Sequence, residues 1–187
     1  TFFGPNALIP LRGDWDNNGT DTVGVYDPAT GSFFLRNANT PGPADLAFNF
    51  GPANQLPIVG DWDGNGTVTV GIYDTATGTF FLRNSNTPGA ADLTFTFGAG
   101  GATPLAGDWD GNGSTTIGIY IEASGVVFLR NTNTPGGADV IFSYGPGTGF
   151  KPLVGNWDGI AGDTIGIFAP ATGACFLRNT NSSGGAD

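Results

Sequence analysis

The strongest constraint in this sequence is an internal repeat of about 47 residues. The motif Gly-Asp-Trp-Asp, or a close variant of it, recurs four times, and its tryptophans are Trp15, Trp62, Trp109 and Trp157. Their spacings are 47, 47 and 48 residues. A fixed period of this length is typical of solenoids, propellers and other repeat arrays, so the single repeat has to be explained before the whole chain.

The second repeat shows most clearly which secondary structure the unit forms. β-branched, aromatic or aliphatic runs occupy 56–60, 68–73 and 79–84, and turn-forming residues separate them. A fourth run, Leu93–Phe97, alternates apolar and polar residues as a strand with one buried face does. Because four short strands recur without any helical pattern, the sequence predicts an all-β fold, a β-propeller of four four-stranded blades of about 47 residues.

The first residues bear on how the last repeat is completed. Thr1–Pro5 resembles Phe48–Pro52, the end of a fourth strand, whereas the last repeat reaches only its third strand and the following loop. We expect one domain over 1–187, with repeats near 6–52, 53–99, 100–146 and 147–187, in which Thr1, Phe2 and Phe3 complete the last blade. The donated strand comes either from the same chain, which closes a ring, or from a neighbouring copy, which builds a filament.

Composition excludes several classes of partner and site. The net charge of -10 repels nucleic acid and anionic lipid, and no apolar run approaches the ~20 residues that span a bilayer. With no His and only Cys175, the chain has no intrachain disulfide and lacks the usual zinc ligands and the commonest general base. Abundant Asn, Thr and Gly with a single lysine favour an extracellular protein or one at the cell surface.

The loop after the first strand of each repeat carries oxygen atoms at the spacing of a calcium loop. Positions 1, 3 and 5 are Asp14, Asp16 and Asn18 in the first copy, then Asp61, Asp63 and Asn65, then Asp108, Asp110 and Asn112. The fourth copy has decayed to Asn156 and Asp158, and every copy has Thr where a further carboxylate is expected. The loops are interpreted either as weak calcium sites or as Asx-turns whose carboxylates bind loop amides without metal.

These loops, with the strands Thr-x-Gly-Ile-Tyr and the endings Phe50-Gly51 and Phe97-Gly98, resemble FG-GAP/VCBS-type repeats. That family forms the calcium-loop blades of integrin-α-like propellers and of many bacterial surface proteins. The resemblance covers all four repeats. It implies propeller blades outside the cell, calcium as the bound ion, and a role in adhesion or surface architecture. The departures are the Thr at the ninth loop position and the presence of four units where seven are usual.

Other recurring residues have structural interpretations. We expect the four tryptophans to pack between adjacent blades rather than to stack on sugar. Glycines in the middle of the second strand of each repeat indicate close backbone approach, and these are Gly24, Gly71, Gly118 and Gly166. The arginines that end each third strand are expected to pair with the aspartates before each fourth strand, and these pairs are Arg36–Asp45, Arg83–Asp92, Arg130–Asp139 and Arg178–Asp187.

The loop between the third and fourth strands offers candidate glycosylation sites. Thr40, Thr87 and Thr134 each precede a proline, a context for O-linked sugar, and Asn181 begins an N-glycosylation sequon. No catalytic constellation is found, because every carboxylate pair recurs in register with the repeat, as scaffold residues do. The sequence therefore predicts a non-enzymatic extracellular structural or adhesive module that assembles with itself or binds surface glycans or proteins. The alternative is a calcium-dependent, lectin-like propeller that binds carbohydrate.

Overall fold

The computed structural model describes residues 8–160 and 162–187, and these fall into two compact units. Unit 1 contains the described residues up to Asp74 together with Thr79–Phe95. Unit 2 contains Thr75–Gly78 and Thr96–Asp187. Each unit is described by itself below. Among the described residues no helix has the length and apolarity that a membrane span requires.

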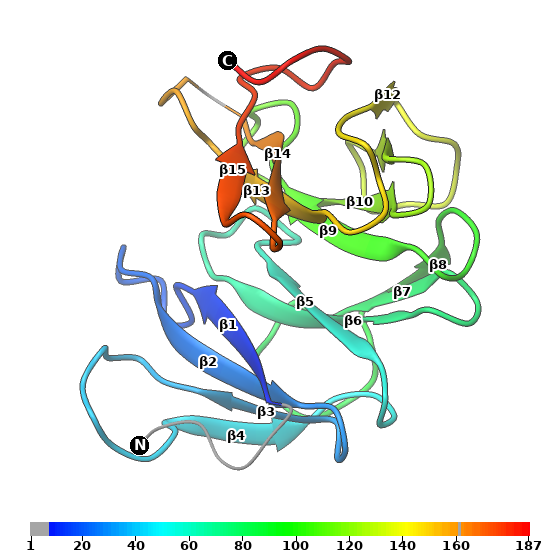
Figure 1. The fold of residues 1–187 in the computed structure, drawn as a ribbon. Helices are drawn as coiled ribbons and strands as arrows, with labels where there is room; N and C mark the ends of the chain where they lie inside the picture. Colours follow the sequence, from blue (N-terminus) through cyan, green and yellow to red (C-terminus); the bar gives the residue numbers. More distant parts are fainter. Residues whose placement is uncertain (1–7, 161) are drawn as a thin grey trace. The chain divides into compact units, whose positions relative to one another are not determined.

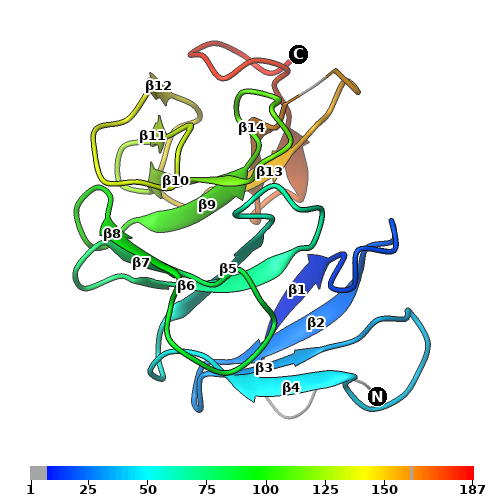
Figure 2. The same cartoon turned by 180° about the vertical axis from the view of Figure 1, so that it is seen from behind.

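The first two repeats form two four-stranded antiparallel sheets (Figures 1 and 2). The first sheet has the order β1 (Ile9–Gly13), β2 (Thr22–Asp27), β3 (Ser32–Leu35), β4 (Leu46–Asn49). The second has the order β5 (Leu56–Gly60), β6 (Thr69–Asp74), β7 (Thr79–Leu82), β8 (Leu93–Thr96). Strands that follow one another in the chain are therefore neighbours in the sheet.

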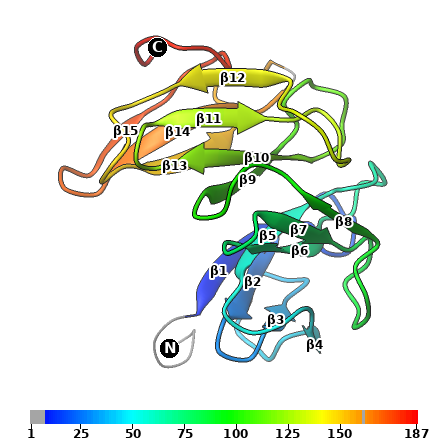
Figure 3. The same ribbon diagram turned by 90° about the vertical axis from the view of Figure 1, so that its right-hand side faces the viewer.

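The third and fourth repeats follow the same order. Figure 3 shows β10, β11 and β12 as successive arrows of the third sheet, which consists of β9 (Thr103–Gly107), β10 (Thr116–Ile121), β11 (Val126–Leu129) and β12 (Val140–Ser143). The fourth sheet consists of β13 (Lys151–Gly155), β14 (Thr164–Ala169) and β15 (Ala174–Phe176). A meander in chain order is the topology of a propeller blade. The all-β, four-blade β-propeller class expected from the sequence is thus confirmed at the level of its blades.

The strand periodicity read from the sequence is also confirmed. In β8, Leu93 and Phe95 face the protein interior while Thr94 and Thr96 are exposed. The hairpin that joins the second and third strands of a sheet closes through Gly31, whose N–H donates to Asp27 O at 2.8 Å. Gly31 has φ 70°, a left-handed conformation that glycine adopts at low cost. The turn residues therefore fix the register of β2 against β3.

The core of each unit lies between consecutive sheets. In unit 1, Trp15 and Phe50 of the first repeat pack with Val70 and Ile72 of the second. In unit 2, Trp109 and Tyr144 of the third repeat pack with Ile165 and Ile167 of the fourth. Within each sheet of unit 1 aromatic rings lie in contact, with centroid distances of 4.7 Å for Tyr26–Phe33 and 4.6 Å for Tyr73–Phe80. One sheet therefore buries the apolar face of the next.

The glycines in the middle of each second strand allow the close approach that the sequence predicts. A Cβ atom built on Gly71 would lie 2.8 Å from Leu82 Cδ2 and 2.9 Å from Ile58 Cγ2. The corresponding distances to the leucine of the third strand are 2.7 Å at Gly24, 2.7 Å at Gly118 and 2.8 Å at Gly166. All these contacts are shorter than ordinary van der Waals contact, so the position accepts no side chain without movement of its neighbours.

We predict that Gly71→Ala destabilises the chain by ~1–3 kcal/mol, the usual cost of overpacking a close-packed core. Part of the obstruction is the carbonyl oxygen of Phe81 at 3.1 Å, which is backbone and cannot rotate away. Chemical denaturation monitored by tryptophan fluorescence measures the change. The matched control is Gly185→Ala, because a Cβ there meets no atom within 4 Å. Equal stabilities for the two variants would contradict the prediction.

Burial raises the pKa of Tyr26, Tyr73 and Tyr120 above the ordinary value of 10.0. Below pH 10 all three are protonated in both the folded and the unfolded chain, so their contribution to stability is fully present. As the pH rises further, the unfolded chain loses these protons first, and folding stability falls. We predict lower denaturant midpoints at about pH 11 than at about pH 8, with a smaller decrease in Tyr120→Phe. Equal midpoints in the wild-type chain would contradict this.

Candidate functional site

The loop between the first and second strands takes its shape from hydrogen bonds between its own side chains and backbone. The two carboxylate oxygens of Asp14 accept the N–H of Asn18 at 3.0 Å and of Gly19 at 2.7 Å. The side-chain oxygen of Asn18 accepts the N–H of Thr20 at 2.9 Å. Asp14 and Asn18, at positions 1 and 5 of the predicted calcium set, are therefore brought together, and the exposed Asp16 at position 3 also hydrogen-bonds to Asp14.

The second and third copies repeat this arrangement almost without change. Asp61 accepts the N–H of Asn65 at 3.0 Å and of Gly66 at 2.7 Å. Asp108 accepts the N–H of Asn112 at 3.0 Å and of Gly113 at 2.8 Å. The position-3 carboxylates, Asp63 and Asp110, are exposed like Asp16. The three loops thus have the same capped conformation.

The decayed fourth copy folds differently. Asn156 Oδ1 accepts the N–H of Gly159 at 2.8 Å, and Asp158 Oδ1 accepts the N–H of Ile160 at 2.9 Å. The amide bound by Asn156 Oδ1 lies three residues away, whereas those bound by Asp108 lie four and five residues away, and the Asn156 side-chain N–H also donates to Ile160 O. The side chain of Ile160 is 69% exposed. The fourth copy therefore has a different turn in place of the capped loop.

The donor set fits a calcium ion only in part. Both oxygens of Asp14 and the oxygen of Asn18 already accept backbone N–H groups, and no third carboxylate is contributed by position 9. Within the described part of the chain, no group of three or more His, Cys, Asp or Glu side chains lies close enough to hold a metal. Desolvation acts to raise the pKa of Asp14, but the hydrogen bonds from Gly19 and Asn18 outweigh it and lower that pKa below 3.8. The capped loop thus forms from its own bonds.

The tryptophans of the first three loops are buried, as the packing interpretation expects. The exposed fractions of Trp15, Trp62 and Trp109 are 3%, 5% and 8%. The indole N–H groups of Trp62 and Trp109 donate to backbone oxygens of Val70 at 3.3 Å and Ile117 at 3.2 Å. These three indole rings therefore offer no exposed surface on which a sugar could stack, as the carbohydrate-binding alternative would require. Trp157 is only half-buried.

Among the residues that the structure describes, the expected arginine–aspartate pairing is found in two of the four repeats, but the shorter bonds of the arginines go to their own loop. The guanidinium of Arg83 donates to backbone oxygens of Thr87 at 2.7 Å and Pro88 at 3.0 Å, and its nearest carboxylate oxygen, on Asp92, is 3.9 Å away. Asp92 instead accepts the N–H of Asn84 at 2.7 Å, which closes the base of the loop. The planar guanidinium carries several N–H donors, so it can satisfy several carbonyl groups of a tight loop at once. A single carboxylate would accept from only some of these donors.

The same pattern holds in the other repeats. Arg130 donates to the oxygens of Thr134 at 2.7 Å and Pro135 at 3.0 Å, and Asp139 accepts the N–H of Asn131 at 2.8 Å. In the first and last repeats, Asp45 and Asp187 accept the N–H of Asn37 at 2.9 Å and Asn179 at 2.7 Å. Of the pairs expected, only Arg83–Asp92 and Arg178–Asp187 approach within 4 Å in the described structure, both at 3.9 Å.

The candidate glycosylation residues lie in these arginine-held loops. Thr87 Oγ1 and Thr134 Oγ1 accept hydrogen bonds from Arg83 and Arg130, each at 3.0 Å, and Thr40 Oγ1 accepts one from Arg36 at 3.3 Å. The side-chain amide of Asn181 donates to Asp163 O at 2.9 Å. An N-linked glycan would attach at this nitrogen. Glycosylation stays a prediction at all four residues.

Sequence reasoning missed the asparagine that ties this loop to the neighbouring strand. Asn39, Asn86, Asn133 and Asn181 each donate a side-chain N–H to the backbone oxygen of the residue just before the second strand, at 2.9–3.0 Å. The recurrence of this asparagine in all four loops is the sequence signal that could have identified it. The loop is thus held by its arginine, its aspartate and its asparagine.

The proposed assembly residues Thr1, Phe2 and Phe3 lie outside the described residues. The strand they were expected to join is β15, the last strand of the described fourth sheet. Cys175 and Phe176 of β15 are exposed, and the exposed fraction of Phe176 is 42%. In the first three sheets a fourth strand pairs with the strand that is equivalent to β15.

Comparison of the chain with protein-family models, with curated proteins and with solved structures finds no match. The resemblance to FG-GAP/VCBS repeats therefore rests on the loop and strand motifs alone and stays a prediction.

Calcium binding likewise stays a prediction. If the ion binds only the folded loops, saturation at 100 times the dissociation constant stabilises the chain by roughly 2.7 kcal/mol for each independent site. We expect calcium to raise the melting temperature and a chelator to reverse the rise. Asp63→Asn is the matched variant, because Asp63 is exposed and lies outside the capping bonds described above. Melting temperatures that do not respond to calcium would contradict the prediction.

Proposed function

We propose that this chain is a non-catalytic, extracellular structural module that associates with further copies of itself through the faces of its sheets, as in a fibre or surface layer. The resemblance to FG-GAP/VCBS repeats supports the extracellular setting. The proposal for association rests on the packing of sheet against sheet within each unit and on a face of the first sheet that the other sheet of unit 1 does not cover.

The second residue of the second strand in each sheet shows whether that face of the sheet is covered by a neighbouring sheet. Val70 in unit 1 has an exposed fraction of 0% and Ile165 in unit 2 has 1%, and each belongs to a core cluster with residues of the preceding sheet of its own unit. Val23 occupies the same position in β2 and is 40% exposed. This difference is the observation that carries the proposal. An apolar position that is buried where a preceding sheet packs on it, and exposed in the first sheet, marks an interaction face.

The third residue of each third strand extends the same face. Phe34 in β3 is 38% exposed, its counterparts Phe81 and Phe128 are half-buried, and the counterpart in the incomplete fourth sheet, Phe176, is 42% exposed. In unit 1, Phe81 packs against the cluster that includes Trp15 of the preceding repeat. Val23 and Phe34 are therefore the surface on which such a tryptophan-bearing sheet would pack. We call these two residues the leading face of the first sheet.

The fourth sheet presents the complementary kind of surface. Trp157 and Leu177 are half-buried there, whereas Trp109 and Leu129 in the third sheet are buried. Cys175 is exposed at a position where Phe33 and Phe80 are fully buried. We call this surface the trailing face of the fourth sheet. In unit 2 the equivalent side of the third sheet packs on Ile165 and Ile167 of the fourth sheet. The leading face of a second copy can pack on the trailing face in the same way.

Charge sets the conditions under which such association occurs. At pH 7 each copy carries a net charge of -10, and copies of like charge repel one another. Salt screens that repulsion, since the Debye length falls to ~8 Å at physiological ionic strength. Apolar contact between the two faces is not weakened by screening. Association should therefore strengthen as salt is added.

We predict that sedimentation velocity shows concentration-dependent association of the wild-type chain at moderate salt. Val23→Asp should weaken it by roughly tenfold or more, because a carboxylate would be buried without a partner. The control is Ile141→Asp, which makes the same charge change at a 59% exposed residue of β12. A wild-type chain that stays monomeric at all concentrations and salt levels would overturn the proposal, and so would equal association of the two variants.

A further inference from the structure

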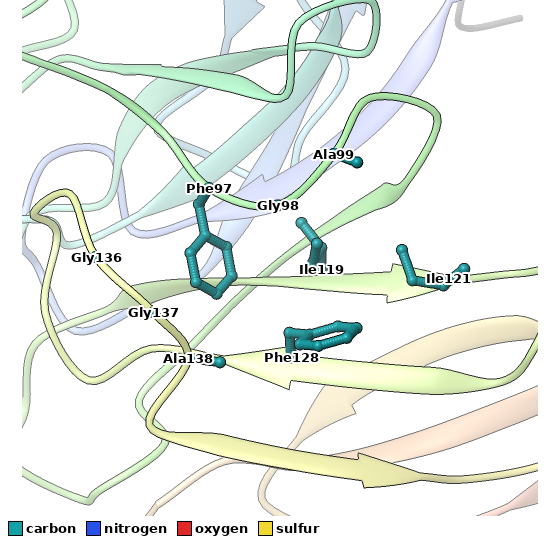
Figure 4. Close-up of a pocket in the computed structure, with 9 residues that line it drawn as sticks. All are labelled: Phe97, Gly98, Ala99, Ile119, Ile121, Phe128, Gly136, Gly137 and Ala138. Carbon is teal, nitrogen blue, oxygen red and sulfur yellow. The ribbon is translucent and has the colours of Figure 1, made fainter.

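A pocket of about 310 Å³ lies within unit 2, where the segment after β8 meets the third sheet. One wall is formed by Phe97 and Gly98, and the opposite wall by side chains of β10 and β11 (Figure 4). The third side is the backbone of Gly136–Ala138, in the loop between β11 and β12. Ligand pockets of proteins begin at about this size.

The lining is apolar throughout. Figure 4 shows Ile119 and Ile121 in line on β10, with the ring of Phe128 beside them on β11 and the ring of Phe97 across the pocket. Phe97 and Ile119 are almost fully buried, with exposed fractions of 4% and 2%. The remaining lining residues are glycine and alanine. Because no charged side chain lines the pocket, a charged ligand would lose its hydration without compensation.

The pocket is held open by a rigid frame. The guanidinium of Arg130 donates to Gly137 O at 2.5 Å as well as to Thr134 and Pro135, which fixes the loop that forms one wall. A Cβ built on Gly98 would lie 2.1 Å from Ile119 Cδ1, so only glycine fits this wall unless Ile119 moves. At Gly137 a Cβ would meet no atom within 4 Å, so there is open space beside this backbone. The cavity is therefore largely preformed.

The same site recurs one repeat later in unit 2, with a volume of about 230 Å³. Tyr144, Gly145, Ile167 and Phe176 take the places of Phe97, Gly98, Ile119 and Phe128. The recurrence shows that the pocket follows from the packing of one repeat on the next. The larger volume belongs to the copy lined by Ile121.

The last residue of the second strand differs between the repeats, and in β10 it is Ile121. The last residue of β2 and of β6 is an aspartate, Asp27 or Asp74, and Asp27 accepts the N–H of Ala29 at 2.9 Å to fix the hairpin. Ile121 replaces that carboxylate in β10 and adds an apolar wall to the pocket. The hairpin of the third sheet still closes, because Gly125 N–H donates to Ile121 O at 2.9 Å. The substitution therefore changes the pocket and not the turn.

We propose that this pocket binds a small uncharged molecule that contains one aromatic ring or a fused pair of rings. Two phenylalanine rings and two isoleucine side chains offer such a ring apolar contact, and aromatic pairs gain additional stabilisation in tilted or offset arrangements. The site requires no association of copies. It adds a ligand-binding activity to the structural role proposed above.

Indole is the probe for the test, with the full isotope-labelled chain observed by NMR. We expect saturable shifts of the amide signals of Gly98, Ile121 and Gly136–Ala138, with smaller shifts around Gly145 in the second copy of the site. Ile121→Asp should weaken binding by roughly tenfold or more, since it removes an apolar wall and introduces a charge. The variant is expected to fold, because aspartate is the residue that the first two sheets have at this position.

The matched control is again Ile141→Asp, which changes the charge equally at an exposed residue of the same sheet outside the lining. The proposal is overturned if shifts do not saturate up to the solubility limit of indole, if they map away from these residues, or if Ile121→Asp binds as tightly as the control. If Ile121→Asp does not fold, the proposal is judged by which amide signals indole shifts in the wild-type chain. Val23→Asp should bind indole normally, so that failure of association and failure of binding are told apart.

Discussion

Burial of one sheet against the next is the interaction on which the rest of this structure depends. A sheet of four short strands has too little interior to bury its own side chains, so each repeat needs a neighbour on its face. Trp15 illustrates this, because it belongs to the first sheet yet packs with Val70 and Ile72 of the second. The mid-strand glycine Gly71 acts within its own sheet, where it lets Leu82 and Ile58 of the two neighbouring strands approach its backbone.

The loops contribute stability of a different kind. Asp14 and Asp61 cap the amides of their own loops, while Arg83 and Arg130 satisfy carbonyl groups that the tight loop leaves without strand partners. Buried or crowded backbone groups are costly when unpaired, so these side chains replace the hydrogen bonds that a regular strand would provide. The loop that resembles a calcium site is thus a self-sufficient corner, and an ion would reinforce a shape that already exists.

Departures from the repeat show where the copies have acquired different properties. Ile121 turns a hairpin-capping carboxylate into a pocket wall, and Val23 leaves a normally buried position exposed. The fourth loop has lost its cap, since Asn156 Oδ1 accepts an amide only three residues away. The pocket proposal rests on Ile121, at a position where β2 and β6 have an aspartate. The association proposal rests on exposure, because Val23 and Val70 are the same residue type and only Val70 is buried.

The sequence by itself determined the strands and the capped loops. Leu93–Thr96 alternates as it was expected to, and Asp14 binds amides only four and five residues away, because such contacts depend on neighbours that the local sequence already contains. Only the tertiary structure decided which partner Arg83 takes, that Val23 is exposed while Val70 is buried, and that Phe97 meets Ile121 across one pocket. Those outcomes depend on which faces of different repeats come into contact, and side-chain packing between distant residues leaves no periodic signal in the chain.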